Sequence, residues 1–168
     1  AAIDARFSYA RQRQEWYVGR RKEAIQELER LLETIPPNDT QLKVRCLLKL
    51  GQWKLAIAGP GENVDMRTRD EVLQLYHRAT VLDPSSYRAW HEFALANYRA
   101  SQEMRTGLQG RPQRGSTQLA TQHLKPLLVS ATQGLLRAIA LGTKSWSASV
   151  QQDMLCLLTL WFRFGHLP

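Results

Sequence analysis

The sequence predicts an all-α fold, an α-solenoid of tetratricopeptide-like helical hairpins, and residues 71–98 carry most of the evidence. Apolar side chains in this stretch recur at three- and four-residue steps, which places them on one side of a helix: Val72, Tyr76, Ala79 and Leu82. Asp83 and Pro84 follow, an N-cap residue and a favoured first helical residue, so the next helix is expected to begin there. The spacing from Tyr76 through Ala79 to Pro84 is typical of tetratricopeptide repeats. Similar helical patterns elsewhere predict about four irregular hairpins in a row.

The first hairpin is predicted over residues 2–35. A helix over residues 2–18 would turn five residues inward: Ile3, Phe7, Ala10, Gln14 and Tyr17. Gly19 ends this helix, and the next one, over residues 21–35, turns Ala24, Leu28, Leu31 and Leu32 inward. Pro36 and Pro37 close the hairpin.

An interrupted second hairpin is predicted next. Its first helix begins at one of the polar residues 38–40, which serves as the cap, and ends at Gly51. Trp53 to Ile57 then start the partner helix. Residues 59–66 cannot continue a helix because of Gly59, Pro60 and Gly61, so they are expected to form an inserted loop before a helix over residues 67–82.

The C-terminal part is divided by a predicted flexible linker. The helix after Pro84 persists to about residue 105, and residues 106–121 are rich in Gly, Ser, Thr and Gln, a composition typical of disordered linkers. Helical pattern resumes at Leu124 to Pro126 and ends at Gly142, and a last helix over residues 145–164 is apolar around most of its circumference. The expected organisation is helical repeats over 1–105, a linker over 106–121, and a further, truncated hairpin of the same solenoid over 122–168.

Composition limits the function classes. The 168 residues are 43% hydrophobic and 23% charged, which suits one globular domain, and 23 Lys and Arg against 15 Asp and Glu give a net charge of +8. This surplus favours a polyanionic partner: nucleic acid, a phosphoinositide headgroup or an inositol polyphosphate. No apolar run is long enough for a membrane span and no export leader is present, so we expect an intracellular protein with reduced thiols at Cys46 and Cys156. The start at Ala1, without methionine, and the end after an apolar run suggest a segment of a longer chain.

No catalytic or metal-binding set is recognisable. The four histidines, His77, His91, His123 and His166, have no second ligand at metal-site spacing and are interpreted as packing or surface residues. Gly59 to Gly61 is not a phosphate loop, because no strand precedes it and no GK[ST] follows. We therefore expect a scaffold and not an enzyme.

Four basic residues form the candidate ligand site: Arg13, Arg45, Lys49 and Arg88. Arg45 and Lys49 are one helical turn apart, so their like charges share a face at a small cost to the helix. If the repeats stack, these cations from successive repeats could converge on a phosphate-rich ligand; the alternative is four ordinary solvated cations. The five tryptophans are interpreted as packing residues, so nucleic-acid binding has only the net charge in its favour.

Three blocks in order, LKVRCLLKLGQW (42–53), YRAWHEFALANYRA (87–100) and LLTLWFRFGHLP (157–168), resemble the FAT domain of the TOR (target of rapamycin) protein kinases. YARQRQEWYVGRRKEAI (9–25) is similar to the hairpin just upstream in that family. The matching blocks reach both ends of the chain. The loops and residues 106–121 are not covered by the resemblance.

The resemblance implies a non-catalytic scaffold that braces the kinase domain of the same polypeptide, a serine/threonine kinase. Its partners would be that domain, neighbouring repeats and TOR complex subunits, without nucleic acid or a membrane span, in the cytoplasm or at endomembrane surfaces. It also implies inositol hexakisphosphate as a structural ligand, with Arg45 and Lys49 matching the family's Arg and Lys. Arg88 and Arg13 stand where the family has Lys, which keeps the charge but changes the donor geometry. The alternative is a free-standing tetratricopeptide adaptor for an acidic peptide or another polyanion; such an adaptor should end in a polar capping helix.

Overall fold

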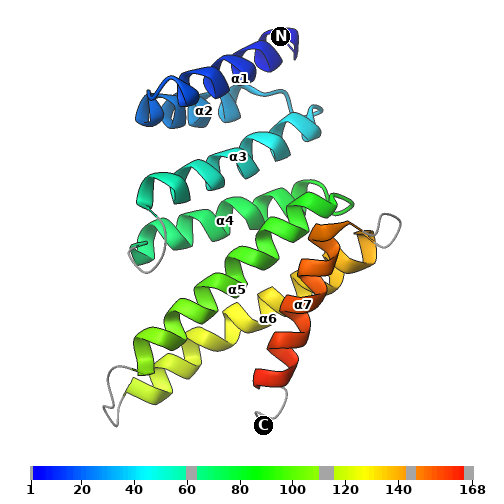
Figure 1. Ribbon diagram of the computed structural model, residues 1–168. Helices are drawn as coiled ribbons and strands as arrows, with labels where there is room; N and C mark the ends of the chain where they lie inside the picture. Colours follow the sequence, from blue (N-terminus) through cyan, green and yellow to red (C-terminus); the bar gives the residue numbers. More distant parts are fainter. Residues whose placement is uncertain (1, 60–63, 110–115, 143–146, 165–168) are drawn as a thin grey trace. The chain divides into compact units, whose positions relative to one another are not determined.

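The described part of the chain is entirely helical. The computed structural model describes residues 2–59, 64–109, 116–142 and 147–164, and these residues form seven helices and no strand (Figure 1). They belong to two compact units, Ala1–Pro84 and Ser85–Pro168. The α-solenoid fold class expected from the sequence is confirmed. The division between units falls at Pro84, whereas the sequence placed its only division at the linker over 106–121. Within the described residues, no helix combines the length and apolarity needed to cross a membrane.

The first unit contains two hairpins, formed by α1 (Ala2–Tyr17) with α2 (Arg21–Thr34) and by α3 (Thr40–Ala58) with α4 (Met66–Leu82). Gly19 joins the first pair at a positive φ of 99°, a conformation that glycine adopts without strain. The predicted inward face of α2 is confirmed, since its four apolar residues are all buried: Ala24, Leu28, Leu31 and Leu32.

The predicted inward face of α1 is wrong. Phe7 and Tyr17 are 73% and 75% exposed, and from Asp4 to Tyr17 the buried residues of this helix are Ala5 and Gln12; the Ile3 side chain lies outside the described part. Ala5, Gln12 and Trp16 follow helical spacing on a different side of α1. The Trp16 ring stacks on Trp53 of α3, with ring centroids 4.7 Å apart and planes 1° from parallel. The Trp16–Trp53 stack thus determines which side of α1 is packed. The apolar side that the sequence pattern predicted to be inward is exposed at Phe7 and Tyr17.

Helix α3 does not end at Gly51, contrary to the sequence prediction. It is continuous from its cap at Asp39, whose side chain accepts a hydrogen bond from the Leu42 backbone N–H at 3.2 Å, to Ala58. Gly51 is buried because the Tyr76 ring of α4 lies against it: a Cβ added there would be 2.3 Å from Tyr76 Cε1. The glycine therefore serves close helix packing, and the predicted partner helix over 53–57 is the last part of α3.

Helices α1 and α3 lie side by side and run in the same direction. Near their first turns, Arg6 Nε lies 3.6 Å from Asp39 Oδ2, and near their other ends Trp16 stacks on Trp53. The first helices of consecutive tetratricopeptide-like hairpins have this relation. The stacked arrangement therefore holds within the first unit.

The second unit is formed by α5 (Tyr87–Gln109), α6 (Ser116–Gly142) and α7 (Ala148–Phe164). Helix α5 begins three residues later than predicted, because Asp83 is the C-cap of α4 and the Ser86 hydroxyl accepts from the Ala89 N–H at 3.3 Å. Helices α5 and α6 approach closely at Gly134, where an added Cβ would be 2.9 Å from the Ala94 Cβ. Small residues thus bring the two longest helices together.

Helix enters the predicted linker from both sides. Residues 106–109 belong to α5 and residues 116–121 to α6, while residues 110–115 lie outside the described residues. Helix α6 was predicted to start near Pro126, but Pro126 lies in its interior. A proline inside a helix removes one hydrogen bond. Extended packing along α5 offsets that loss, because tertiary contact supplies most helical stability.

Helix α7 packs on α6 and touches α5. Leu160 of α7 joins a buried cluster with Ala94, Ala131 and Leu135. Its exposed surface also carries large apolar side chains: Leu155, Leu158, Trp161 and Phe162 are 51–75% accessible. The predicted apolar circumference of this helix is therefore confirmed over the described residues.

Candidate functional site

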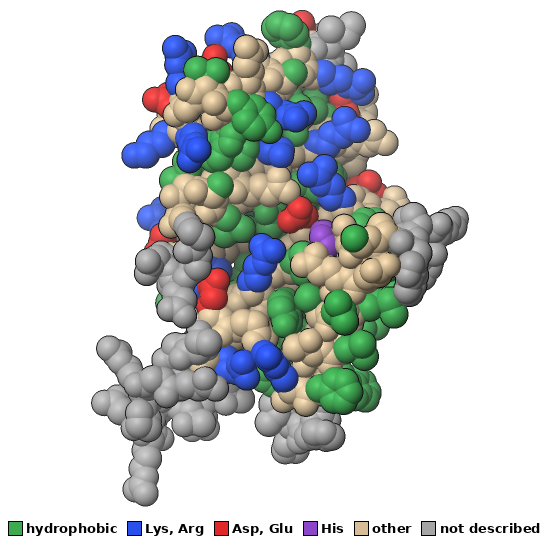
Figure 2. Space-filling view, in the orientation of Figure 1, with side chains coloured by type: hydrophobic (Ala, Val, Ile, Leu, Met, Phe, Trp, Pro, Cys, Tyr) green, Lys and Arg blue, Asp and Glu red, His purple; other side chains and the backbone are tan. Residues whose placement is uncertain are grey.

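Arg45 and Lys49 of the candidate ligand site lie on α3, one turn apart. The Arg45 side chain is exposed, and Lys49 is half-buried with its Nζ donating to Gln52 Oε1 at 3.0 Å. Basic side chains are frequent over the N-terminal helices in the space-filling view (Figure 2). The pair forms a local cationic site on the surface of the first unit.

Arg13 lies on the neighbouring helix. It is seven residues after Arg6, so both residues project from the same side of α1, and Arg6 reaches Asp39 at the start of α3. Along α1, Arg13 falls between this ion pair and the Trp16 stack on Trp53. The structure therefore places Arg13 on the side of α1 that is adjacent to α3, and its side chain is exposed.

Arg88 lies in the second unit. It is in the first turn of α5 and its side chain is exposed. Arg13, Arg45 and Lys49 come from two adjacent parallel helices of the first unit, and Arg88 comes from α5 of the second unit.

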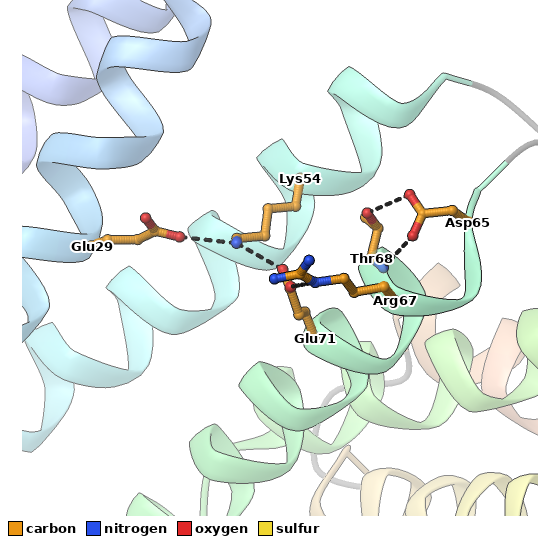
Figure 3. A network of polar contacts seen from close by, with 6 residues as sticks. All are labelled: Glu29, Lys54, Asp65, Arg67, Thr68 and Glu71. Carbon is orange, nitrogen blue, oxygen red and sulfur yellow. Dashed lines mark hydrogen bonds and ion pairs between the residues drawn. The ribbon is translucent and has the colours of Figure 1, made fainter.

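A polar network centred on Lys54, which sequence reasoning missed, joins three helices of the first unit (Figure 3). Lys54 Nζ of α3 lies 2.9 Å from Glu29 Oε1 of α2 and 3.1 Å from Glu71 Oε2 of α4. Arg67 Nε adds a contact of 3.2 Å to the other oxygen of Glu71. Burial alone would lower the pKa of Lys54, but its hydrogen bonds to Glu29 and Glu71 outweigh burial and raise it. The hydrogen bond from Lys54 likewise lowers the pKa of Glu71.

The same network borders a groove of about 310 Å³ between α2 and α4. Glu29 and Glu33 line one side, Gln74 and Arg78 the other, and Leu50 of α3 contributes apolar surface. Because carboxylates and cations alternate around it, this groove is not a site for a polyanion. The network instead ties α2, α3 and α4 together.

The second unit contains a buried carboxylate. Asp153 of α7 is fully buried, and the Tyr87 hydroxyl of α5 donates to its Oδ2 at 2.9 Å. His91 Nδ1, one turn along α5, lies 2.8 Å from Asp153 Oδ1. Burial, followed by the hydrogen bond to Asp153, raises the pKa of Tyr87 above its usual range. The only sequence signal for this contact is an acidic residue within the apolar stripe of α7, since more than 60 residues separate its partners.

The remaining candidates have ordinary structural roles. His77 and His123 are exposed, His91 belongs to the cluster just described, and His166 lies outside the described residues. Among the described residues, no three His, Cys, Asp or Glu side chains are grouped as metal ligands would be. Cys46 is a buried free thiol whose pKa burial raises to about 12, with a smaller contribution from Asp39.

A family model described as "FAT domain" matches residues 3–159 of this helical chain. The chain belongs to the FAT domain family. This FAT chain is 31% identical over 133 residues to serine/threonine-protein kinase tor1 of Schizosaccharomyces pombe, covering 79% of the chain and 5% of the relative. It is 29% identical over 154 residues to serine/threonine-protein kinase TOR2 of Saccharomyces cerevisiae, covering 77% and 6%. For serine/threonine-protein kinase mTor of Drosophila melanogaster the identity is 27% over 143 residues, covering 80% and 6%.

The FAT chain thus spans about one-twentieth of the length of the curated relatives it matches. The three named relatives all carry TOR kinase names, in agreement with the resemblance found in the sequence blocks. The match to the family covers residues of both compact units, so both units belong to one FAT segment.

Proposed function

We propose that this FAT segment is a non-catalytic helical scaffold of a TOR serine/threonine protein kinase, which braces the kinase domain within a cytoplasmic TOR complex. The family match over residues 3–159 carries this proposal, together with the TOR names of the relatives. Helices tied by buried small residues and a three-helix ion network provide the rigidity that a brace requires. The exposed apolar side of α7 supports a segment embedded in a larger assembly over a free-standing adaptor with polar ends.

The bracing role is tested in the full-length kinase. Gly51→Leu would push α4 away from α3 inside the segment itself, because the glycine is packed against Tyr76 of α4. Reduced kinase activity, with faster amide hydrogen exchange in the kinase domain, is expected. Gln41→Leu, at an exposed position of the same helix, is the control. Normal activity and exchange in Gly51→Leu, with α3–α4 shown to be loosened, would contradict the bracing role.

We further propose that Arg13, Arg45 and Lys49 contribute to an inositol hexakisphosphate site. Their support is the placement of Arg13 beside α3 and the like-charge pair on α3, whose repulsion a polyanion would relieve. Arg88 enters the proposal through the sequence resemblance alone. The ligand would act structurally, because binding selectively to the folded state stabilises that state.

A thermal-shift titration with inositol hexakisphosphate tests this site. The wild-type chain should gain about 2.7 kcal/mol at a ligand concentration one hundred times the dissociation constant. Arg45→Glu/Lys49→Glu should lose the response. Lys22→Glu/Arg78→Glu, at two exposed cations of the same unit, makes the same charge change and should keep it. If inositol hexakisphosphate stabilises both double variants equally, its binding depends on the net charge of the chain and not on this site.

A further inference from the structure

The inward side of α7 is mostly apolar, with Asp153 as its buried charged residue and Ser149 half-buried beside Tyr87. Val150, Asp153 and Leu160 are the buried residues of this helix, and Leu157 and Phe164 pack against the same core. Asp153 and Leu160 are seven residues apart and therefore share a side. Apolar contacts of this kind are not directional, so they would tolerate a shift of α7 along the α5–α6 hairpin.

Asp153 does not tolerate such a shift. Its two oxygens are held by Tyr87 and His91, at 2.9 and 2.8 Å, and both partners lie on α5. The Tyr87 hydroxyl donates to one oxygen of Asp153, and the His91 ring nitrogen is within hydrogen-bond distance of the other. A slip of one turn would bring Cys156 or Leu157 to these donors in one direction, or Ser149 or Val150 in the other, and would move the carboxylate away from both donors. An unpaired buried charge is strongly unfavourable, so this alignment of α7 is preferred.

A polar contact farther along these two helices does not fix their alignment. Arg163 of α7 donates to Gln102 Oε1 of α5 at 2.7 Å, but this pair is exposed. A long exposed arginine can follow a movement of several ångströms by changing rotamers and contributes little. The alignment therefore depends on the buried cluster.

We propose that Asp153 sets the register of α7 on the α5–α6 hairpin and thereby positions the exposed apolar stripe of α7. The stripe consists of Leu155, Leu158, Trp161 and Phe162, which are all exposed; Leu155, Leu158 and Phe162 lie on the side opposite to Asp153, and Trp161 lies at its flank. A slip of one turn would move the stripe by about 5.4 Å and rotate it by about 40° or 60°, depending on whether the slip is four or three residues. Tyr87 and His91 thus determine, from a neighbouring helix, where α7 presents its apolar surface. A single buried polar residue sets helix register in coiled coils by the same physics.

Pulsed electron–electron distance measurement tests the register directly. Spin labels at two exposed positions, Gln133→Cys on α6 and Gln152→Cys on α7, report the axial position of α7. Cys156→Ala removes the half-buried native thiol, and Cys46 stays because it is fully buried. The labelled protein with Asp153 should show one narrow distance peak. Asp153→Leu should retain its helical circular dichroism but show a second peak, displaced by several ångströms.

Two further variants make the result decisive. Asp153→Asn keeps an oxygen acceptor and should keep the single peak, whereas Gln151→Leu, an apolar change on the exposed side of α7, should change nothing. One unchanged peak in folded Asp153→Leu overturns the proposal. If Asp153→Leu loses helix, the double variant His91→Leu/Asp153→Leu removes the carboxylate together with its imidazole partner and leaves the Tyr87 hydroxyl in place. A second peak in the double variant supports register control, and a single peak or loss of α7 in it shows that the cluster only supports folding.

Discussion

Gly51→Ala tests the close packing of α3 against α4 with the smallest possible change. The new Cβ would lie 2.3 Å from Cε1 and 2.7 Å from Cζ of Tyr76, more than 1 Å inside an ordinary carbon–carbon contact. Tyr76 is 1% exposed and cannot turn towards solvent, so the two helices must separate. Overpacking of a core costs about 1–3 kcal/mol. The better helix propensity of alanine returns about 1 kcal/mol.

We therefore expect Gly51→Ala to lower the free energy of unfolding by up to about 2 kcal/mol. Urea unfolding, followed by tryptophan fluorescence, should show a lower midpoint with an unchanged slope. Ala56→Gly, at an exposed position of α3, measures the propensity contribution separately. Adding Tyr76→Leu should make the effect of Gly51→Ala smaller, because the two residues are in contact. A Gly51→Ala protein that is more stable than wild type by the propensity difference would refute the packing argument.

Three other predictions follow from contacts in the first unit. The folded state lowers the pKa of Glu71, so the network stabilises the protein fully above the ordinary pKa of 4.5 and loses this contribution as the pH falls. Lys54→Met should therefore flatten the pH dependence of the urea midpoint in that acid range. An unchanged pH profile would contradict this prediction. Asp39→Ala should destabilise by about 1 kcal/mol through loss of the α3 cap, as measured by thermal unfolding, while Asp39→Asn should lose clearly less. Burial raises the pKa of Cys46 to about 12, so this thiol should resist iodoacetamide at pH 8 until urea unfolds the protein. Mass spectrometry measures the alkylation. Rapid alkylation of the folded protein would contradict the burial of Cys46.

Sequence periodicity predicted the helices well where one side of a helix is clearly apolar. The inward residues of α2 and the tyrosine and alanine of α4 lie where the pattern placed them, because burial of an apolar stripe determines both the pattern and the packing. The sequence rules for helix boundaries were wrong at two positions. Gly51 was predicted to end a helix and Pro126 to lie near the start of one, but both lie inside helices. In both places a neighbouring helix decides the outcome, through the Tyr76 ring or through packing along α5.

The candidate site was predictable only in part. Spacing alone places Arg45 and Lys49 on one face of a helix, but the position of Arg13 beside α3 depends on the Arg6–Asp39 pair and the Trp16–Trp53 stack. The Lys54 network and the Asp153 cluster join residues far apart in sequence, and each partner alone resembles an ordinary surface or packing residue. Contacts of this kind become visible only when the helices are placed side by side.

The small-residue contact between α5 and α6 has a practical consequence for engineering. Because Gly134 and Ala94 bring the two helices together, their pairing relies on the contact along their length and not on the peptide that joins them. Each doubling of the length of a connection adds only about 0.6 kcal/mol of closure entropy. The sequence between Gln109 and Ser116 is therefore a suitable place to insert an affinity tag or a fluorescent domain, which would mark this segment inside a very large polypeptide.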